Sequence, residues 1–141
     1  MANRWWIYQH ECFPLLAHGS LVAAFSFSAV SFSSLLRGQV ELPEAGAVLV
    51  AFMSALLFFL QLRIADEFKD HEEDARYRSY RPVPRGLVTL RELRVIGVGS
   101  ALVQLGLALW WDPSIALLLA LVWLYLSLMS KEFFARDWLK V

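Results

Sequence analysis

Six carboxylates lie within nine residues near the middle of the chain, directly after a long uncharged segment: Asp66, Glu67, Asp70, Glu72, Glu73 and Asp74. If one helix runs through them, steps of about 100° per residue place all except Glu72 within an arc of about 120°. Like charges at four-residue spacing repel each other, so this face predicts a positive partner. Carboxylate oxygens suit Mg²⁺, which takes one or two carboxylates and completes its shell with water and phosphate oxygens.

A segment rich in arginine and proline, Arg81-Pro82-Val83-Pro84-Arg85-Gly86, follows the acidic cluster. The prolines end a helix, and Gly86 permits a turn back toward the preceding residues. Basic side chains can therefore fold over the acidic face. Metal, diphosphate and arginine together would neutralise charges that would repel if they were alone.

Other interpretations of these charges are open. The carboxylates can be solvated, or paired with Lys69, Arg76 and Arg78 in a helix outside the membrane. The basic stretch 76–94 can hold anionic lipid. A small cation-binding or transport protein is a further alternative, but it predicts carboxylates inside the spans, and the predicted spans contain none. The spacing of Asp66, Asp70 and Asp74, followed by the arginine-proline segment, favours a metal site.

The elements that position these residues are predicted to be membrane helices. Hydrophobic residues make up 58% of the 141, which is too apolar for an ordinary soluble domain. A bilayer core about 30 Å thick needs roughly 20 apolar residues per helix. Four segments are suitable: 15–36, 45–62, 95–111 and 113–130. We expect an all-α, multi-pass membrane bundle forming one domain over 1–141, with a charged loop at 63–94.

Lysine and arginine indicate the orientation of these helices. With alternating spans, twelve of the 13 basic residues fall on one side and only Arg37 on the other. Basic residues near span ends are retained in the cytoplasm. We therefore predict a protein of the cell (inner) membrane whose two termini and charged loop are cytoplasmic.

The acidic cluster and the segment after it resemble the signature of the UbiA family of intramembrane prenyltransferases, roughly NDxxDxxxD followed by RPxPxG. Asp66 stands where the family commonly has Asn and Glu67 where it often has Asp, and the later aspartates match Asp70 and Asp74. The second element matches at Arg81, Pro82, Pro84 and Gly86.

The resemblance implies a function. Family members bind Mg²⁺ and the diphosphate of an isoprenoid donor, and transfer the isoprenoid group to an aromatic or lipid acceptor. It implies that Asp70 and Asp74 are metal ligands, with Asp66 and Glu67 adjusting the same site, and that Arg81 contacts the diphosphate. Lys131 fits the lysine of a YxxxK element near the diphosphate, although Ser127 occupies the tyrosine position. A lysine that reaches from a helix end to the interface is the alternative.

Length is the main departure from the family. Its members usually have nine spans and a second aspartate-rich motif, whereas this sequence has four predicted spans and one such motif. We expect the chain to correspond to the N-terminal half of the fold, to need a complementary C-terminal half, and to be inactive alone; a non-catalytic membrane fragment is the alternative. The CDP-alcohol phosphotransferases are a rival class, whose signature begins with DGxxAR and places its DxxxD after that element. Here Asp74-Ala75-Arg76 lacks the glycine and comes after the other aspartates, so the order is wrong. We predict no nucleic-acid partner.

Overall fold

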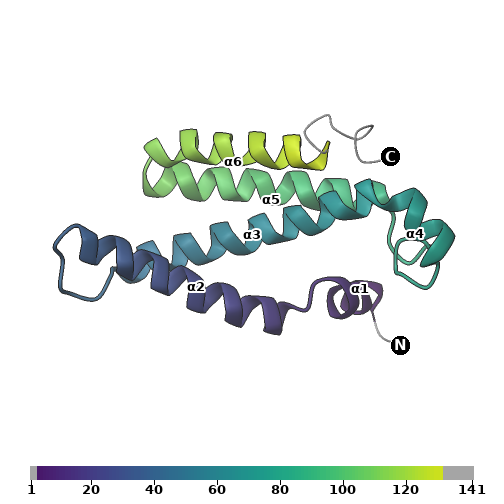
Figure 1. Ribbon diagram of the computed structural model, residues 1–141, viewed down its shortest axis with the longest axis horizontal. Coiled ribbons are helices and arrows are strands. Elements are labelled where there is room, and N and C mark those ends of the chain that lie inside the picture. The colour runs from purple at the N-terminus through teal and green to yellow at the C-terminus, as the bar shows by residue number, and fades with distance from the viewer. Residues whose placement is uncertain (1–2, 132–141) are drawn as a thin grey trace, which may run out of the picture.

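The computed structural model describes residues 3–131, which form helices and, within that range, no strand. Four long helices are joined in sequence, with one short helix before them and another in the middle (Figure 1). They are α1 (Arg4–Cys12), α2 (Leu15–Leu36), α3 (Ala45–Lys69), α4 (His71–Tyr77), α5 (Leu90–Trp111) and α6 (Ser114–Ser130). The predicted all-α class is confirmed.

Three of the long helices, α2, α3 and α5, are long and apolar enough to cross a membrane. The fourth, α6, is apolar but has 17 residues. The helices α3 and α5 extend beyond the predicted spans into the charged segment. The start of α5 is defined by a capping box, in which Thr89 Oγ1 accepts from Glu92 N at 3.2 Å and Glu92 Oε2 accepts from Thr89 N at 2.9 Å.

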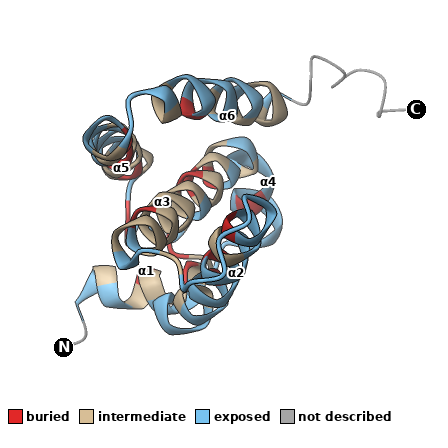
Figure 2. Ribbon diagram, turned by 90° about the vertical axis from the view of Figure 1, so that its left-hand side faces the viewer, coloured by how far each residue is buried: buried red, intermediate tan, exposed pale blue. Residues whose placement is uncertain are grey.

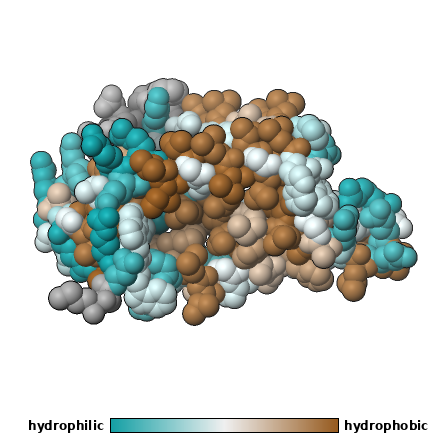
Figure 3. All heavy atoms as spheres, turned by 180° about the vertical axis from the view of Figure 1, so that it is seen from behind, coloured by the Kyte–Doolittle hydropathy of each residue, from teal (hydrophilic) through white to brown (hydrophobic). Residues whose placement is uncertain are grey.

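The central helix of the bundle is α3, which packs against α2 on one side and α5 on the other; α6 packs mainly on α5 (Figure 2). Much of α2 and α6 is exposed, including large apolar side chains such as Leu16, Phe25 and Leu117. These residues form a broad apolar belt between two polar ends (Figure 3). A lipid environment accounts for such a surface, because exposing so large an apolar area to water is energetically unfavourable.

Inside the belt, a polar network joins three helices. Gln104 Oε1 on α5 accepts from Gln61 Nε2 on α3 at 2.9 Å and from Trp123 Nε1 on α6 at 3.1 Å. Gln104 Nε2 donates to the backbone oxygen of Ser54 at 2.9 Å. Buried amides in an apolar medium need such partners, so the network sets how the three helices are rotated against each other.

Most of the described charged residues gather at one end of the bundle. Figure 1 shows α1, α4 and the last turn of α6 at this end, which we call the charged end. The opposite end consists of the segment between α2 and α3 and the tight connection at Asp112 and Pro113. If the bundle crosses a membrane, α1 and the acidic cluster therefore lie on the same side of that membrane, as the distribution of basic residues predicted.

One expectation about the acidic cluster is wrong. A single helix through it would gather five carboxylates on one face, but α3 ends at Lys69 and α4 begins at His71. The backbone bends at Asp70. As a result Glu67 and Asp74 are buried, Asp70 is half-buried, and Asp66 and Glu73 are exposed.

Candidate functional site

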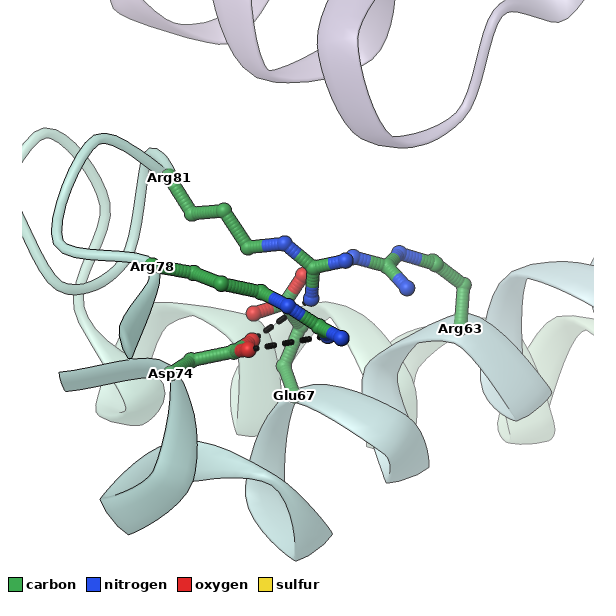
Figure 4. A network of polar contacts seen from close by, with 5 residues as sticks. All are labelled: Arg63, Glu67, Asp74, Arg78 and Arg81. Carbon is green, nitrogen blue, oxygen red and sulfur yellow. Dashed lines mark hydrogen bonds and ion pairs between the residues drawn. The ribbon is translucent and has the colours of Figure 1, made fainter. Parts of the chain in front are cut away.

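Two buried carboxylates meet three arginines at the charged end (Figure 4). The side chains of Glu67 and Asp74 are each 2% exposed. Arg63 pairs with Glu67 one turn along α3. Asp74 Oδ2 accepts from Arg81 Nη1 at 2.6 Å, and its Oδ1 accepts from Arg78 Nη1 at 3.3 Å. We call these five residues the arginine-carboxylate network.

The network carries more positive than negative charge. Three guanidinium groups point toward one another over two carboxylates (Figure 4). Guanidinium groups stay protonated in proteins, so one positive charge is left without a carboxylate inside the network. A partly buried excess charge of this kind favours binding of an anion, and arginine suits phosphate oxygens in particular.

The arginine-proline segment brings Arg81 to Asp74 as its sequence predicts. After α4, the backbone N–H of Arg81 donates to Arg78 O at 3.0 Å and that of Gly86 donates to Val83 O at 3.0 Å. Gly86 has φ +75°, a conformation that favours glycine over other residues. Pro82 and Val83 are buried against the core. The segment therefore folds back over the end of α3 and fixes its first arginine.

The remaining predicted metal ligands are differently placed. Asp66 and Asp70 form no ion pair with any described residue. They lie one turn apart, since Asp70 N donates to Asp66 O at 2.9 Å. Over residues 3–131 no three His, Cys, Asp or Glu side chains form a group that would hold a metal by themselves. The four predicted ligands thus divide into two that hold arginines and two that remain available.

The structure does not bring Lys131 into the network with Arg81. It follows α6 and lines a groove of about 580 Å³ between α3, α5 and α6. Arg94 and Phe68 line the same groove, with Arg94 Cζ 5.5 Å from the ring centre of Phe68. None of the network residues lines it.

A profile of the UbiA prenyltransferase family matches residues 24–138. The chain belongs to the UbiA prenyltransferase family. Comparison with curated proteins and with solved structures gave no significant match. The family match begins within α2 and includes α3, α5, α6, the acidic cluster and the arginine-proline segment. It confirms the resemblance that those motifs indicated.

Some residues at the charged end of this UbiA chain were missed by sequence reasoning. Arg63 was not singled out, although its four-residue separation from Glu67 is the spacing at which helix side chains pair. The whole of α1 was also missed. Nothing in the aromatic and charged composition of that stretch indicates which distant residues it contacts.

The first helix of the UbiA chain, α1, packs against the network from outside the family match. Tyr8 belongs to one buried cluster with Ile64, Val83 and Leu93. Burial raises the pKa of the Tyr8 phenol well above its usual range, and Glu67 raises this pKa further. Burial likewise raises the pKa of the Cys12 thiol. Both groups therefore stay protonated at neutral pH beside Arg63.

Proposed function

We propose that this chain takes part in prenyl transfer, binding the diphosphate of an isoprenoid donor at the charged end so that the isoprenoid group can pass to an aromatic or lipid acceptor. The observation that carries the proposal is the excess positive charge of the arginine-carboxylate network, placed where apolar helices meet a polar end. A diphosphate needs the positive charge, and an isoprenoid chain needs the apolar helices. Family membership supports the same reaction class.

The donor set fits Mg²⁺ as an ion shared with the diphosphate. Asp66 and Asp70 would hold it, because neither has an ion-pair partner among the described residues and Mg²⁺ commonly uses one or two carboxylates together with phosphate oxygens. When bound, the metal would neutralise negative charge on the leaving diphosphate. Glu67 and Asp74 would serve differently, by holding arginines in place.

The arginines supply the remaining stabilisation of the leaving group. Arg81 is pinned by Asp74 and Arg63 by Glu67, so their guanidinium groups are already oriented before an anion arrives. Fixed charges of this kind stabilise developing negative charge with little reorganisation. A cation-transport function is less well supported, since it predicts carboxylates inside the membrane and the predicted spans 15–36, 45–62, 95–111 and 113–130 contain none.

The apolar belt would receive the isoprenoid chain. Its exposed side chains on α2, α5 and α6 leave apolar faces that the described helices do not cover. An allylic cation must be shielded from water while it reacts. We propose that a complementary set of helices, a C-terminal half, covers part of these faces, and that the site opens to the cytoplasm.

Magnesium titration with and without geranyl diphosphate, followed by calorimetry in detergent, tests the proposal. We expect the diphosphate to tighten Mg²⁺ binding to the wild type, and Asp70→Asn to weaken the combined binding about tenfold or more by removing a charged ligand. Glu72→Gln is the matched control, because Glu72 is an exposed carboxylate in the same cluster. Equal affinities for all three proteins would disprove the metal site, and a full prenyl-transfer assay with added aromatic acceptors would test the reaction itself.

A further inference from the structure

The groove between α3, α5 and α6 combines apolar walls with positive charge at one end. Its volume of about 580 Å³ falls within the range of roughly 300–1,000 Å³ that ligand sites occupy. Ile64, Phe68 and Leu126 are among its apolar lining residues, and no Asp or Glu of the described residues lines it. Its two cations are Arg94, in the second turn of α5, and Lys131, directly after α6. Both positions belong to the charged end (Figure 1).

The polar side chains deeper in the groove already have partners. Gln61 Nε2 and Trp123 Nε1 donate to Gln104 Oε1 at 2.9 and 3.1 Å. The hydroxyl groups of Ser127 and Ser130 each donate to a backbone oxygen of α6 at 2.8 Å. A polar ligand group buried here would lose its hydrogen bonds to water and find few to replace them. The interior of the groove therefore suits a hydrocarbon chain.

The two cations of the groove are available to an anion. Over residues 3–131, neither Arg94 nor Lys131 forms an ion pair. Arg94 Cζ lies 5.5 Å from the ring centre of Phe68, a contact that keeps the guanidinium group beside the apolar wall. Arginine and lysine both bind phosphate oxygens. A ligand with an apolar chain and a phosphate at its end matches both parts of the groove.

The groove is separate from the site proposed for the diphosphate. On α3 it is lined by residues 61, 64, 65 and 68, which share one helix face. Steps of about 100° per residue place Asp66 on roughly the opposite face. The groove thus has two cations and no carboxylate to share a metal ion with a ligand. This charge suits a phosphodiester, which carries one negative charge, better than a diphosphate, which carries more and uses Mg²⁺.

We propose that the groove binds an anionic phospholipid from the membrane leaflet at the charged end. One acyl chain would lie along α3, α5 and α6, and the phosphodiester would lie between Arg94 and Lys131. Basic pockets between membrane helices bind anionic lipid headgroups in this way. The inference goes beyond prenyl transfer and does not depend on it. It assigns Lys131 to a lipid phosphate in place of the diphosphate that the family resemblance implies.

Native mass spectrometry of the full chain in detergent tests the headgroup contacts by counting bound lipids. The probes are phosphatidylglycerol and phosphatidylcholine with identical acyl chains. We expect one phosphatidylglycerol to bind in preference to phosphatidylcholine. Arg94→Gln and Lys131→Gln should each weaken its binding about fivefold, the effect of losing one cation beside an anionic lipid. Arg91→Gln is the matched control, because Arg91 is exposed on the same helix but does not line the groove.

Two further variants separate the charge and the apolar wall from the folding of the chain. Arg94→Lys keeps the positive charge and should recover most of the affinity that Arg94→Gln loses. Ala101→Leu adds volume at the inner end of the groove and should weaken binding with both cations in place. Gly99→Leu is its control, since a Cβ there meets open space and Gly99 does not line the groove. Thermal unfolding is the second readout: phosphatidylglycerol should stabilise the wild type more than Arg94→Gln.

Several outcomes would overturn the proposal. Equal binding of the two lipids would show general contact with lipid, and an equal loss in Arg91→Gln and Arg94→Gln would show a diffuse charge effect. Displacement of phosphatidylglycerol by geranyl diphosphate with Mg²⁺ would assign the groove to the isoprenoid donor. A dimer that binds no phosphatidylglycerol would assign it to a second copy of the chain. Selective binding that depends on Arg94 would support the lipid site whether or not prenyl transfer occurs.

Discussion

Asp74 connects α4 to the segment that follows it. Its two oxygens accept from Arg78 and Arg81, and both arginines lie beyond the end of α4. The pair with Arg78 is one that the structural alternative for the acidic cluster predicted. The bond to Arg81 spans the turn into the arginine-proline segment, so a single buried carboxylate serves both folding and the orientation of a proposed ligand-binding arginine.

Replacing Asp74 by Asn should therefore destabilise the charged end. The substitution removes the negative charge and leaves two arginines beside a neutral group, and breaking a largely buried ion pair costs about 3–5 kcal/mol. Because both arginines are partly exposed, we expect a value near or below the lower limit. Thermal unfolding in detergent measures it. Glu73→Gln, at an exposed neighbour, should have little effect, and equal unfolding temperatures for the two variants would contradict this role.

At the scale of helices, packing is determined by a few interior contacts rather than by an extensive core. The hydrogen bonds of Gln104 join α5 to α3 and α6 within the apolar belt. Apolar side chains facing lipid provide no strong preference for one helix rotation over another. A buried amide with matched partners does provide one.

The substitution Gln104→Leu should loosen the association of α3, α5 and α6. It removes the shared acceptor of Gln61 and Trp123, and we expect a loss of about 1–2 kcal/mol, in the range measured for interhelical hydrogen bonds in membranes. Unfolding in mixed detergent micelles measures this loss. Gln39→Leu, outside the helices and exposed, is the control and should unfold as the wild type does. A Gln104 variant with unchanged stability would show that apolar packing alone fixes these helices.

A close contact between α3 and α5 lies at the opposite end. A Cβ atom at Gly46 would lie 2.7 Å from Cζ3 of Trp111, closer than real contacts allow. Gly46→Ala should therefore displace the indole and cost about 1–3 kcal/mol, as other overpacked sites do. In a Trp111→Leu background the cost should fall, which a double-mutant cycle measures.

The matched control for this contact is Gly106→Ala. No atom lies within 4 Å of a Cβ at Gly106, so alanine should be neutral or stabilise α5 by about 0.5–1 kcal/mol through its helix preference. If Gly46→Ala behaved like Gly106→Ala, the close approach of the two helices would be disproved.

For the whole molecule, polar surface lies at both ends of an apolar belt (Figure 3). The described basic residues except Arg37 lie at the charged end, together with the arginine-carboxylate network. The arrangement suits a membrane protein whose charged end faces the cytoplasm. We expect a cysteine at Ser79 to be protected from an impermeant thiol reagent added outside intact cells, and one at Gln39 to be labelled. Each is introduced with Cys12→Ala, so that the native thiol does not contribute.

Permeabilised cells provide the control for this labelling, since both positions should then react. Labelling of Ser79→Cys from outside with protection of Gln39→Cys would reverse the predicted orientation. Labelling of both positions in intact cells would contradict a bundle in which α2 and α3 cross the bilayer as a hairpin.

Several features of the molecule followed from the sequence alone. The four apolar helices could be predicted because length and hydropathy are local properties that a bilayer constrains strongly. The turn through Arg81 to Gly86 could also be predicted, since proline and glycine restrict or permit backbone angles wherever they occur. These same residues carried the family resemblance that the match over 24–138 confirms.

The tertiary structure decided which charges are buried and which remain available. Equal spacing along the chain made Asp66, Asp70 and Asp74 look alike, but the bend at Asp70 gives them different surroundings. Tyr8 packs with Ile64 and Val83 only because α1 returns to the end of α3 and packs there. Burial and ion pairing depend on such contacts between distant segments, and no local pattern of residue types contains them.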